Sequence, residues 1–170
     1  MRMRTCVSGG ETCVDRAPAT RAPRHTYNDE DRIARISVVI ADDHSGFRQA
    51  LADVIQAESD MCVVASVGDG AAALDAIRRL APVVAVLDVR MPVLDGIEIA
   101  RAVAEQGGPT RTVIMTMHWG QSVVERVASL PVSGYLAKET ALLEVVAAIR
   151  CAAAGEIYVA PVLTAAFPRG

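Results

Sequence analysis

The feature of this sequence that most constrains its fold is a regular alternation between two kinds of segment. Short apolar runs without internal polar alternation occur five times, at residues 36–41, 61–67, 83–87, 111–115 and 133–136. Such runs are typical of strands that are buried on both faces. The segments between them have apolar residues at every third or fourth position, which predicts helices with one buried face. Five strands alternating with five helices indicate an α/β domain whose parallel sheet is covered on both faces.

The five predicted helices have apolar stripes, and two of them have clear ends. The stripes run from Phe47 to Ile55, Ala73 to Ile77, Leu94 to Ala104, Val123 to Leu130 and Leu142 to Ile149. Glycine ends the third helix in Gly107-Gly108-Pro109 and the fifth at Gly155, as glycine commonly does just after a helix. The Gly68-Asp69-Gly70 segment lacks the further residues of a nucleotide-binding loop, so we interpret it as a turn into a helix.

Composition predicts one globular domain with extensions at both ends. Apolar residues make up 52% of the 170-residue chain, which is enough for a sizeable core, and the net charge of −3 argues against a strongly basic nucleic-acid binder. No apolar run reaches the ~18 residues of a membrane-spanning helix, so we expect no membrane segment. The four cysteines form no C-x-x-C pair and predict reduced thiols in a cytoplasmic protein: Cys6, Cys13, Cys62 and Cys151.

The chain divides into three parts. Residues 1–35 have few apolar residues and no periodicity, which predicts a disordered N-terminal extension. Residues 36–155 carry the alternating pattern and form the predicted domain. Residues 156–170 contain Pro161 and Pro168 and predict the start of a C-terminal linker.

Chemically capable side chains stand where four of the predicted strands end. Asp42 and Asp43 follow the first strand, Asp88 the third and Thr116 the fourth, and Lys138 comes shortly after the fifth. Ligands of open α/β sheets bind at the carboxyl ends of the strands. Three carboxylates gathered there require a cation, and Mg²⁺ suits a site with few oxygen ligands. Because a carboxylate can attack phosphorus while a metal, an ammonium and a hydroxyl stabilise the transferred charge, the set predicts a phosphoryl-accepting site.

Lys138 also stands out by composition. It is the only lysine of the chain, whereas the other 16 of the 17 basic residues are arginine. An ammonium is a compact point charge that fits a tight pocket beside a carboxylate or phosphoryl group, where a broad guanidinium does not. This bias indicates that position 138 needs an ammonium.

Four motifs occur together in a fixed order. They are Val38–His44 (VVIADDH), Leu87–Gly96 (LDVRMPVLDG), Val113–His118 (VIMTMH) and Ser133–Lys138 (SGYLAK). As an ordered set they resemble the receiver domain of two-component response regulators, in its NarL/FixJ (LuxR-type) branch, from about residue 36 to residue 161. The resemblance implies a flavodoxin-like, doubly wound sheet of five strands in the order 2-1-3-4-5. It also implies a regulatory phosphoacceptor domain rather than an enzyme.

The same resemblance implies a role for each site residue. Asp88 matches the phosphoacceptor, and Mg²⁺ is expected at Asp42, Asp43, Asp88 and the backbone carbonyl of Arg90. Thr116 and Lys138 match the residues that bind the phosphoryl group, and Tyr135 matches the aromatic residue that changes rotamer on phosphorylation. Arg90 and His118, two residues beyond Asp88 and Thr116, are expected to tune hydrolysis of the phosphoryl group; the alternative is that both are solvated residues at the rim of the site.

Taken one at a time, these residues also have ordinary structural explanations. Asp42 or Asp43 alone predicts a helix cap, Asp88 a turn, Thr116 ordinary strand composition, Tyr135 an edge of the core and Lys138 a surface charge. The ordered set favours the functional interpretation. The sequence departs from the family pattern at Pro131-Val132, where Gly-Ala is usual, and at Glu139, where proline often follows the lysine.

The implied partners are a sensor histidine kinase as phosphodonor and a second copy of the chain. We expect a homodimer on phosphorylation, formed through residues 123–136 or through the helices at 47–55 and 142–149. Because no basic recognition helix occurs before Gly170, we expect no direct DNA binding by this chain. It is then either the receiver of a transcription factor or a stand-alone receiver that acts through protein contacts. An aspartyl-nucleophile phosphatase is a weaker alternative, because no second acid stands two residues after Asp42.

Overall fold

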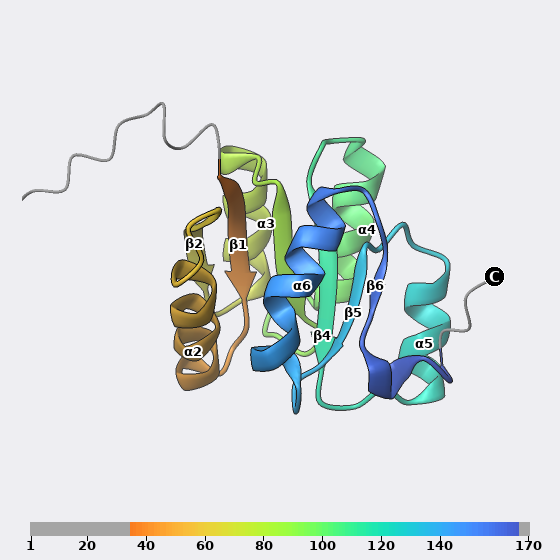
Figure 1. The fold of residues 1–170 in the computed structure, drawn as a ribbon. Coiled ribbons are helices and arrows are strands. Elements are labelled where there is room, and N and C mark those ends of the chain that lie inside the picture. Colours follow the sequence, from red (N-terminus) through yellow and green to blue (C-terminus); the bar gives the residue numbers. More distant parts are fainter. Residues whose placement is uncertain (1–34, 167–170) are drawn as a thin grey trace, which may run out of the picture.

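The computed structural model describes residues 35–166, in which six parallel strands form one sheet in the order β2-β1-β3-β4-β5-β6 (Figure 1). The strands are β1 (Ile36–Ala41), β2 (Met61–Val67), β3 (Val84–Asp88), β4 (Arg111–Thr116), β5 (Gly134–Ala137) and β6 (Tyr158–Val159). The central strand β3 is buried along its whole length, as are the last four residues of β1. Burial on both faces explains why these strands have no polar alternation.

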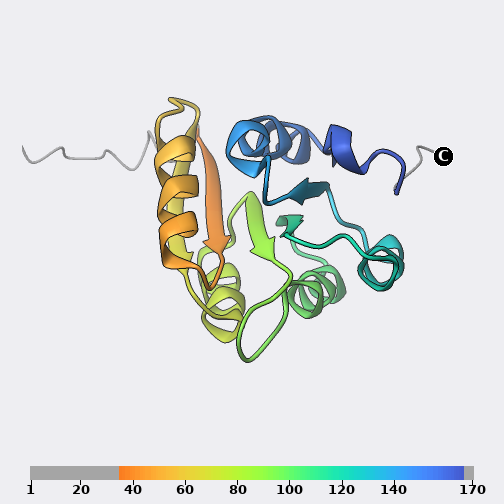
Figure 2. The same ribbon diagram turned by 90° about the horizontal axis from the view of Figure 1, so that it is seen from below.

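Helices cover both faces of the sheet. They are α2 (Ser45–Gln56), α3 (Gly70–Leu80), α4 (Gly96–Gln106), α5 (Gln121–Ala128) and α6 (Ala141–Ala153). Figure 2 shows α2 and α6 on one face and α3, α4 and α5 on the other. The predicted stripes turn toward the sheet, where Leu51, Ile77 and Ile149 are buried. The predicted α/β class with helices on both faces is therefore confirmed.

The predicted number of strands is wrong, because the sheet has six strands rather than five. Residues 156–170 were predicted as the start of a linker, yet Tyr158–Val159 pair with β5. The amides of Tyr158 and Ala160 donate to the carbonyls of Ser133 and Tyr135, each at 3.0 Å. A short 3₁₀ helix, η1 (Pro161–Leu163), follows and buries Leu163. A two-residue strand is too short to show a period in the sequence.

Several predictions fall on residues outside the described range. The predicted disordered extension, with Cys6 and Cys13, lies there except for Arg35. Cys62 and Cys151 are free thiols. Within residues 35–166, no helix has the length and apolar character that crossing a bilayer requires.

The loop between β3 and α4 is held by close backbone packing. Asp95 caps α4, since its Oδ1 accepts from the amide of Glu98 at 2.7 Å while the Glu98 carboxylate accepts from the Asp95 amide at 2.8 Å. Gly96 donates its amide to the carbonyl of Val89 at 3.1 Å. A Cβ at position 96 would lie 2.2 Å from the carbonyl oxygen of Asp88, so only glycine fits there. Gly96 thereby brings the start of α4 against the backbone of Asp88.

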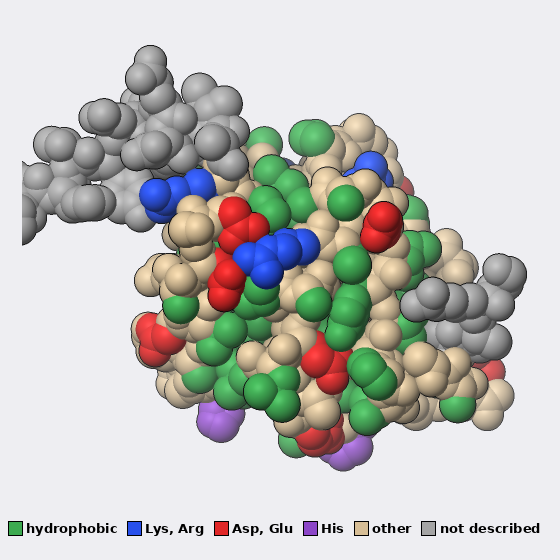
Figure 3. Space-filling view, viewed as in Figure 1, with side chains coloured by type: hydrophobic (Ala, Val, Ile, Leu, Met, Phe, Trp, Pro, Cys, Tyr) green, Lys and Arg blue, Asp and Glu red, His purple; other side chains and the backbone are tan. Residues whose placement is uncertain are grey.

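A charged cluster ties α6 to the turn after α2. The Arg150 guanidinium contacts Asp60 at 2.9 Å through two nitrogens and Glu58 at 2.6 Å. Figure 3, which has the same view as Figure 1, shows basic and acidic side chains next to one another with hydrophobic side chains around them. All three residues are partly exposed, and exposed ion pairs add little to stability. We therefore expect the cluster mainly to orient α6 relative to α2.

We predict that Gly96→Ala destabilises the protein by at least about 2 kcal/mol, because a methyl group cannot fit against the Asp88 carbonyl without moving the backbone. Urea unfolding measures this change. Gly46→Ala is the matched control: Gly46 also lies in the first turn of a helix, but nothing stands within 4 Å of the added Cβ. The control should be neutral or slightly stabilising. Equal stability of the two variants would contradict the packing argument.

Candidate functional site

Three carboxylates meet at the carboxyl ends of the adjacent strands β1 and β3. Asp42 directly follows β1, Asp88 is the last residue of β3, and Asp43 follows Asp42. One carboxylate oxygen from each lies within 4.8 Å of the other two. Asp42 is 0% exposed and Asp88 is 3% exposed, whereas Asp43 faces solvent. Two buried carboxylates this close repel each other strongly unless positive charge stands between them.

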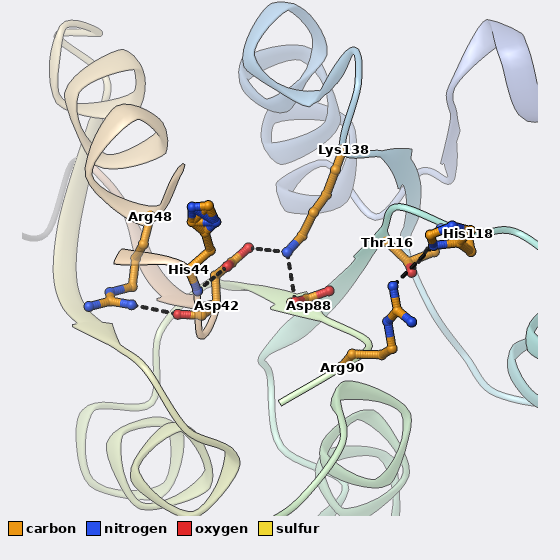
Figure 4. Close-up of polar contacts among 8 residues, drawn as sticks. All are labelled: Asp42, His44, Arg48, Asp88, Arg90, Thr116, His118 and Lys138. Carbon is orange, nitrogen blue, oxygen red and sulfur yellow. Dashed lines mark hydrogen bonds and ion pairs between the residues drawn. The ribbon is translucent and has the colours of Figure 1, made fainter. Parts of the chain in front are cut away.

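Lys138 supplies that charge (Figure 4). Its Nζ donates to Asp88 Oδ2 at 2.7 Å and lies 2.8 Å from Asp42 Oδ2, and its side chain is only 9% exposed. The ring of Phe47, from α2, lies 5.4 Å from the ammonium and provides a cation–π contact. Burial works to lower the pKa of Lys138, but the two carboxylates outweigh it, so the pKa is raised and the ammonium stays charged.

The cluster has more negative than positive charges, which favours binding of a cation. Asp42 Oδ2 is buried and has the Lys138 ammonium as its partner at 2.8 Å. Burial raises the pKa of Asp88; hydrogen bonding and charge attraction from Lys138 oppose this effect, and the charge of Asp42 adds to it. One ammonium faces three carboxylates. Their oxygen atoms are the type of ligand that Mg²⁺ prefers, so the residues present fit a divalent cation.

Two more of the predicted site residues lie on the strands β4 and β5. Thr116 is the last residue of β4 and is buried, and its Oγ1 accepts from the amide of His118 at 3.3 Å. Tyr135 lies in β5 at 8% exposure, with its ring against Trp119 in an edge-on contact at 6.0 Å. Burial also raises the pKa of the Tyr135 hydroxyl. The Trp119 indole donates to the carbonyl of Leu136 at 2.9 Å, which places this tryptophan beside β5.

An open pocket of about 410 Å³ leads to Asp88. It is lined by Asp43, His44, Asp88, Arg90, Met117 and Lys138. At its rim, Arg90 Nη2 lies 3.0 Å from His118 Nδ1, and because an arginine can only donate, that nitrogen of His118 is the acceptor. The pair joins the segment after β3 to the segment after β4.

The structure thus brings Lys138 into direct contact with Asp42 and Asp88 and places Asp43 beside them, with Thr116 and Tyr135 on the neighbouring strands β4 and β5. Sequence reasoning did not assign His44 and Met117 to the site, although both lie within the quoted motifs, directly after Asp43 and Thr116. It also missed Phe47 and Arg48, which reach the site from α2. The only signal for the last two was their position just after the DDH motif.

The capping explanation for the acidic pair does not hold for α2. Its N-cap is His44, which makes no side-chain capping bond. Asp42 Oδ1 instead accepts from the amide of His44 at 2.8 Å and closes the turn after β1. By contrast, Asp69 does cap α3, accepting from the amide of Ala72 at 2.9 Å, as a turn into a helix requires.

We predict that Lys138→Met lowers the free energy of unfolding by about 3–5 kcal/mol at pH 8, because it leaves two buried carboxylates without their counter-charge. The loss should shrink at pH 5.5. Without the ammonium the pKa of Asp88 rises further above its unfolded value, so the folded variant binds a proton more tightly than the unfolded chain and gains stability as pH falls. Urea unfolding at both pH values tests this. Arg79→Met, which breaks an exposed pair with Asp75, is the control and should change stability by less than about 0.5 kcal/mol. An equal loss at both pH values for Lys138→Met would contradict the electrostatic explanation.

Comparison with known proteins agrees with this geometry. Residues 38–150 match the model of the response regulator receiver domain. The chain is 36% identical over 129 residues to the probable transcriptional regulatory protein NarL of Mycobacterium tuberculosis, covering 76% of this chain and 60% of that protein. It is 31% identical over 120 residues to the DNA-binding transcriptional activator DevR/DosR of the same organism, covering 71% and 55%. The chain thus spans about three fifths of the length of these relatives.

Solved structures give the same result. The signal receiver domain of the putative response regulator NarL from Mycobacterium tuberculosis superposes with a TM-score of 0.69 at 34% identity, covering 72% of this chain and 98% of that one. A LuxR-family DNA-binding response regulator from Staphylococcus aureus gives a TM-score of 0.67 at 26% identity, covering 69% and 98%. The chain belongs to the response regulator receiver domain family of two-component systems, in its NarL/LuxR branch.

Proposed function

We propose that this chain accepts a phosphoryl group on Asp88 from a sensor histidine kinase and responds by changing its conformation and its association with a second copy. The observation that carries the proposal is the contact of Lys138 with both Asp42 and Asp88 at the base of an open pocket. A buried carboxylate with its own ammonium, reachable from solvent, has the surroundings that a phosphoryl acceptor needs.

Mg²⁺ is the proposed cofactor, held by Asp42, Asp43, Asp88 and the backbone carbonyl of Arg90. The cluster of three carboxylates, which share one ammonium, supports this assignment. When bound, the ion neutralises part of the negative charge and polarises the oxygens of the incoming phosphoryl group. The exposure of Asp43 leaves space for the waters that Mg²⁺ keeps.

The proposed transfer forms one bond and breaks one. A carboxylate oxygen of Asp88 bonds to phosphorus as the phosphorus–nitrogen bond of the donor phosphohistidine breaks, and the nitrogen leaves with the bonding pair. Later, water attacks phosphorus, the phosphorus–oxygen bond to Asp88 breaks, and the carboxylate and inorganic phosphate are released. Lys138 is already beside Asp88 and would contact a phosphoryl oxygen. Arg90 lines the pocket and is paired with His118, and the two would govern how easily water enters.

Thr116 and Tyr135 are proposed to report the phosphoryl group to the rest of the domain. The Thr116 Oγ1 accepts a long hydrogen bond from the His118 amide, and its O–H can donate to a phosphoryl oxygen. Movement of Thr116 opens space at the end of β4, into which Tyr135 can turn from the adjacent strand β5. The two-state element would then be α5 together with β5, biased by charge added at Asp88.

The expected homodimer has two candidate surfaces, and we propose one of them. The outer edge of β5 is covered by β6, whose following residue Ala160 is fully buried. On the other candidate surface, formed by α2 and α6, Leu143 is 88% exposed and Leu142 is 38% exposed. An exposed apolar helix face is typical of a protein interface. We therefore place the dimer on the α2/α6 face.

The output of the whole protein is also a proposal. The relatives named above are transcriptional regulators, and this chain spans only part of their length. We propose that in the cytoplasm the receiver controls a LuxR-type DNA-binding domain, while residues 35–166 themselves do not contact DNA. A stand-alone receiver that acts through protein contacts is the alternative. In either case we propose a regulatory domain rather than an enzyme.

The central prediction is that Asp88→Asn abolishes phosphorylation. Incubation with acetyl phosphate and Mg²⁺ should add the mass of one phosphoryl group to the wild-type protein and none to the variant, because an amide is not a comparable nucleophile. Intact-mass spectrometry measures both. Asp75→Asn, a carboxylate 74% exposed on α3, is the control and should gain the same mass as wild type. Undiminished phosphorylation of Asp88→Asn would refute the proposed acceptor.

A second prediction concerns the metal. Addition of Mg²⁺ in roughly the millimolar to tens-of-millimolar range should change the fluorescence of Trp119 with saturation, because a site with few protein ligands binds Mg²⁺ weakly. Asp43→Ala should abolish the saturating response. Asp53→Ala, which removes an exposed carboxylate on α2 that accepts a hydrogen bond from Gln49, should leave it unchanged. Identical titrations of wild type and Asp43→Ala would refute the metal assignment.

A third prediction uses the single lysine. In Lys138→Arg the charge is kept, but the larger, planar guanidinium should misplace the contact with the phosphoryl oxygen. Asp88 should still be phosphorylated, whereas dimerisation at equal phosphorylation should be weaker than in wild type, since a switch needs different contacts in its two states. Analytical ultracentrifugation of both phosphorylated proteins compares them. Equal dimerisation would mean that any cation suffices at position 138.

A further inference from the structure

The turn between β1 and α2 carries two of the three carboxylates, yet its own residues do little to hold it. The N-cap residue His44 makes no side-chain capping bond. Among residues 35–166, the Asp43 carboxylate makes no hydrogen bond or ion pair. Its position therefore depends on the backbone of residues 42–44. The side chain of Asp42 closes the turn by accepting from the His44 amide, but the direction of the Asp42 carbonyl needs a partner outside the turn.

Arg48 is that partner. It lies one turn into α2, and its Nη1 donates to the backbone carbonyl of Asp42 at 2.6 Å (Figure 4). This is a charge-assisted hydrogen bond, which is stronger than a neutral one. The carbonyl side of the turn is thereby held by α2, while the Asp42 amide is held by the carbonyl of Val67 at 3.1 Å.

The guanidinium of Arg48 also lies close to Gly68. A Cβ at Gly68, directly after β2, would lie 3.3 Å from Arg48 Nη1 and 3.8 Å from its Cζ. The planar group therefore lies against the Gly68 backbone on one side and reaches the Asp42 carbonyl with one nitrogen. The end of β1, the end of β2 and the start of α2 all meet at this one side chain.

We propose that Arg48 is a positioning residue for the metal-binding acidic pair: by holding the Asp42 carbonyl it sets where the Asp42 and Asp43 carboxylates point. This inference rests on the proposed function, because it assumes that these carboxylates hold Mg²⁺. Arg48 itself touches neither the cation nor the phosphoryl group. Its action is geometric, and partners that orient metal ligands in this way typically contribute tenfold or more to metal affinity.

The test compares Mg²⁺ affinity in several variants of the full chain. Mg²⁺ is titrated against Trp119 fluorescence, and the Mg²⁺-dependent rise in melting temperature provides a second measurement of the same affinity. We expect Arg48→Met to raise the Kd for Mg²⁺ about tenfold. Arg48→Lys keeps the charge but has one donor group on a flexible stem, so it should recover only part of the affinity. Gln49→Ala is the matched control on the same helix, because Gln49 bonds only Asp53, and its Kd should stay within about twofold of wild type.

Gly68→Ala tests the same mechanism without changing Arg48. The added methyl crowds Nη1 at 3.3 Å and should shift the guanidinium, raising the Kd by about threefold. This variant also serves if Arg48→Met does not fold. A wild-type Kd in folded Arg48→Met, or in Gly68→Ala if Arg48→Met is unfolded, would overturn the inference while leaving the proposed function intact. An identical Mg²⁺ response in wild type and Asp43→Ala would overturn both.

Discussion

The contact of one ammonium with two buried carboxylates is the interaction on which this site depends. Asp42 follows β1, Asp88 ends β3 and Lys138 follows β5. The contact therefore joins β1 and β3 to β5, which is separated from β3 by β4. Burial makes the arrangement costly to break, because either carboxylate left alone would be a charge without a partner. The same burial raises the pKa of Asp88 and strengthens the attraction between its carboxylate and Lys138.

The loops around this contact are held by the backbone more than by side-chain charge. Gly96 packs against the Asp88 carbonyl, and Arg48 holds the Asp42 carbonyl, so each acidic strand end has a partner that acts on its main chain. Asp95, which caps α4, also receives the guanidinium of Arg126 from α5 at 2.5 Å. The helix proposed to move on phosphorylation is therefore tied to the loop that follows the proposed acceptor. A change at the end of β3 has a short physical route to α5.

The C-terminal segment adds a sixth strand to the five-stranded sheet that the family resemblance predicted. In the predicted five-stranded sheet, β5 would be an edge strand with unpaired backbone groups. Here Tyr158 and Ala160 donate to the carbonyls of Ser133 and Tyr135, and Leu163 is buried behind them. Pairing of this kind removes an exposed edge that could otherwise associate with other chains. It also places the backbone of Tyr135 in direct contact with the segment that continues toward the C-terminus.

The sequence by itself determined the strands, the helices and the residues at the strand ends, because burial on both faces leaves continuous apolar runs and the residue after each run is local information. It therefore predicted Asp42, Asp43, Asp88, Thr116 and Lys138 as one set. Only the tertiary structure decided that Arg48 bonds the Asp42 carbonyl, that Phe47 lies beside Lys138 and that β6 pairs with β5. Each of these contacts joins residues from different elements, so it depends on how the elements pack. The periodicity within one segment carries no information about that packing.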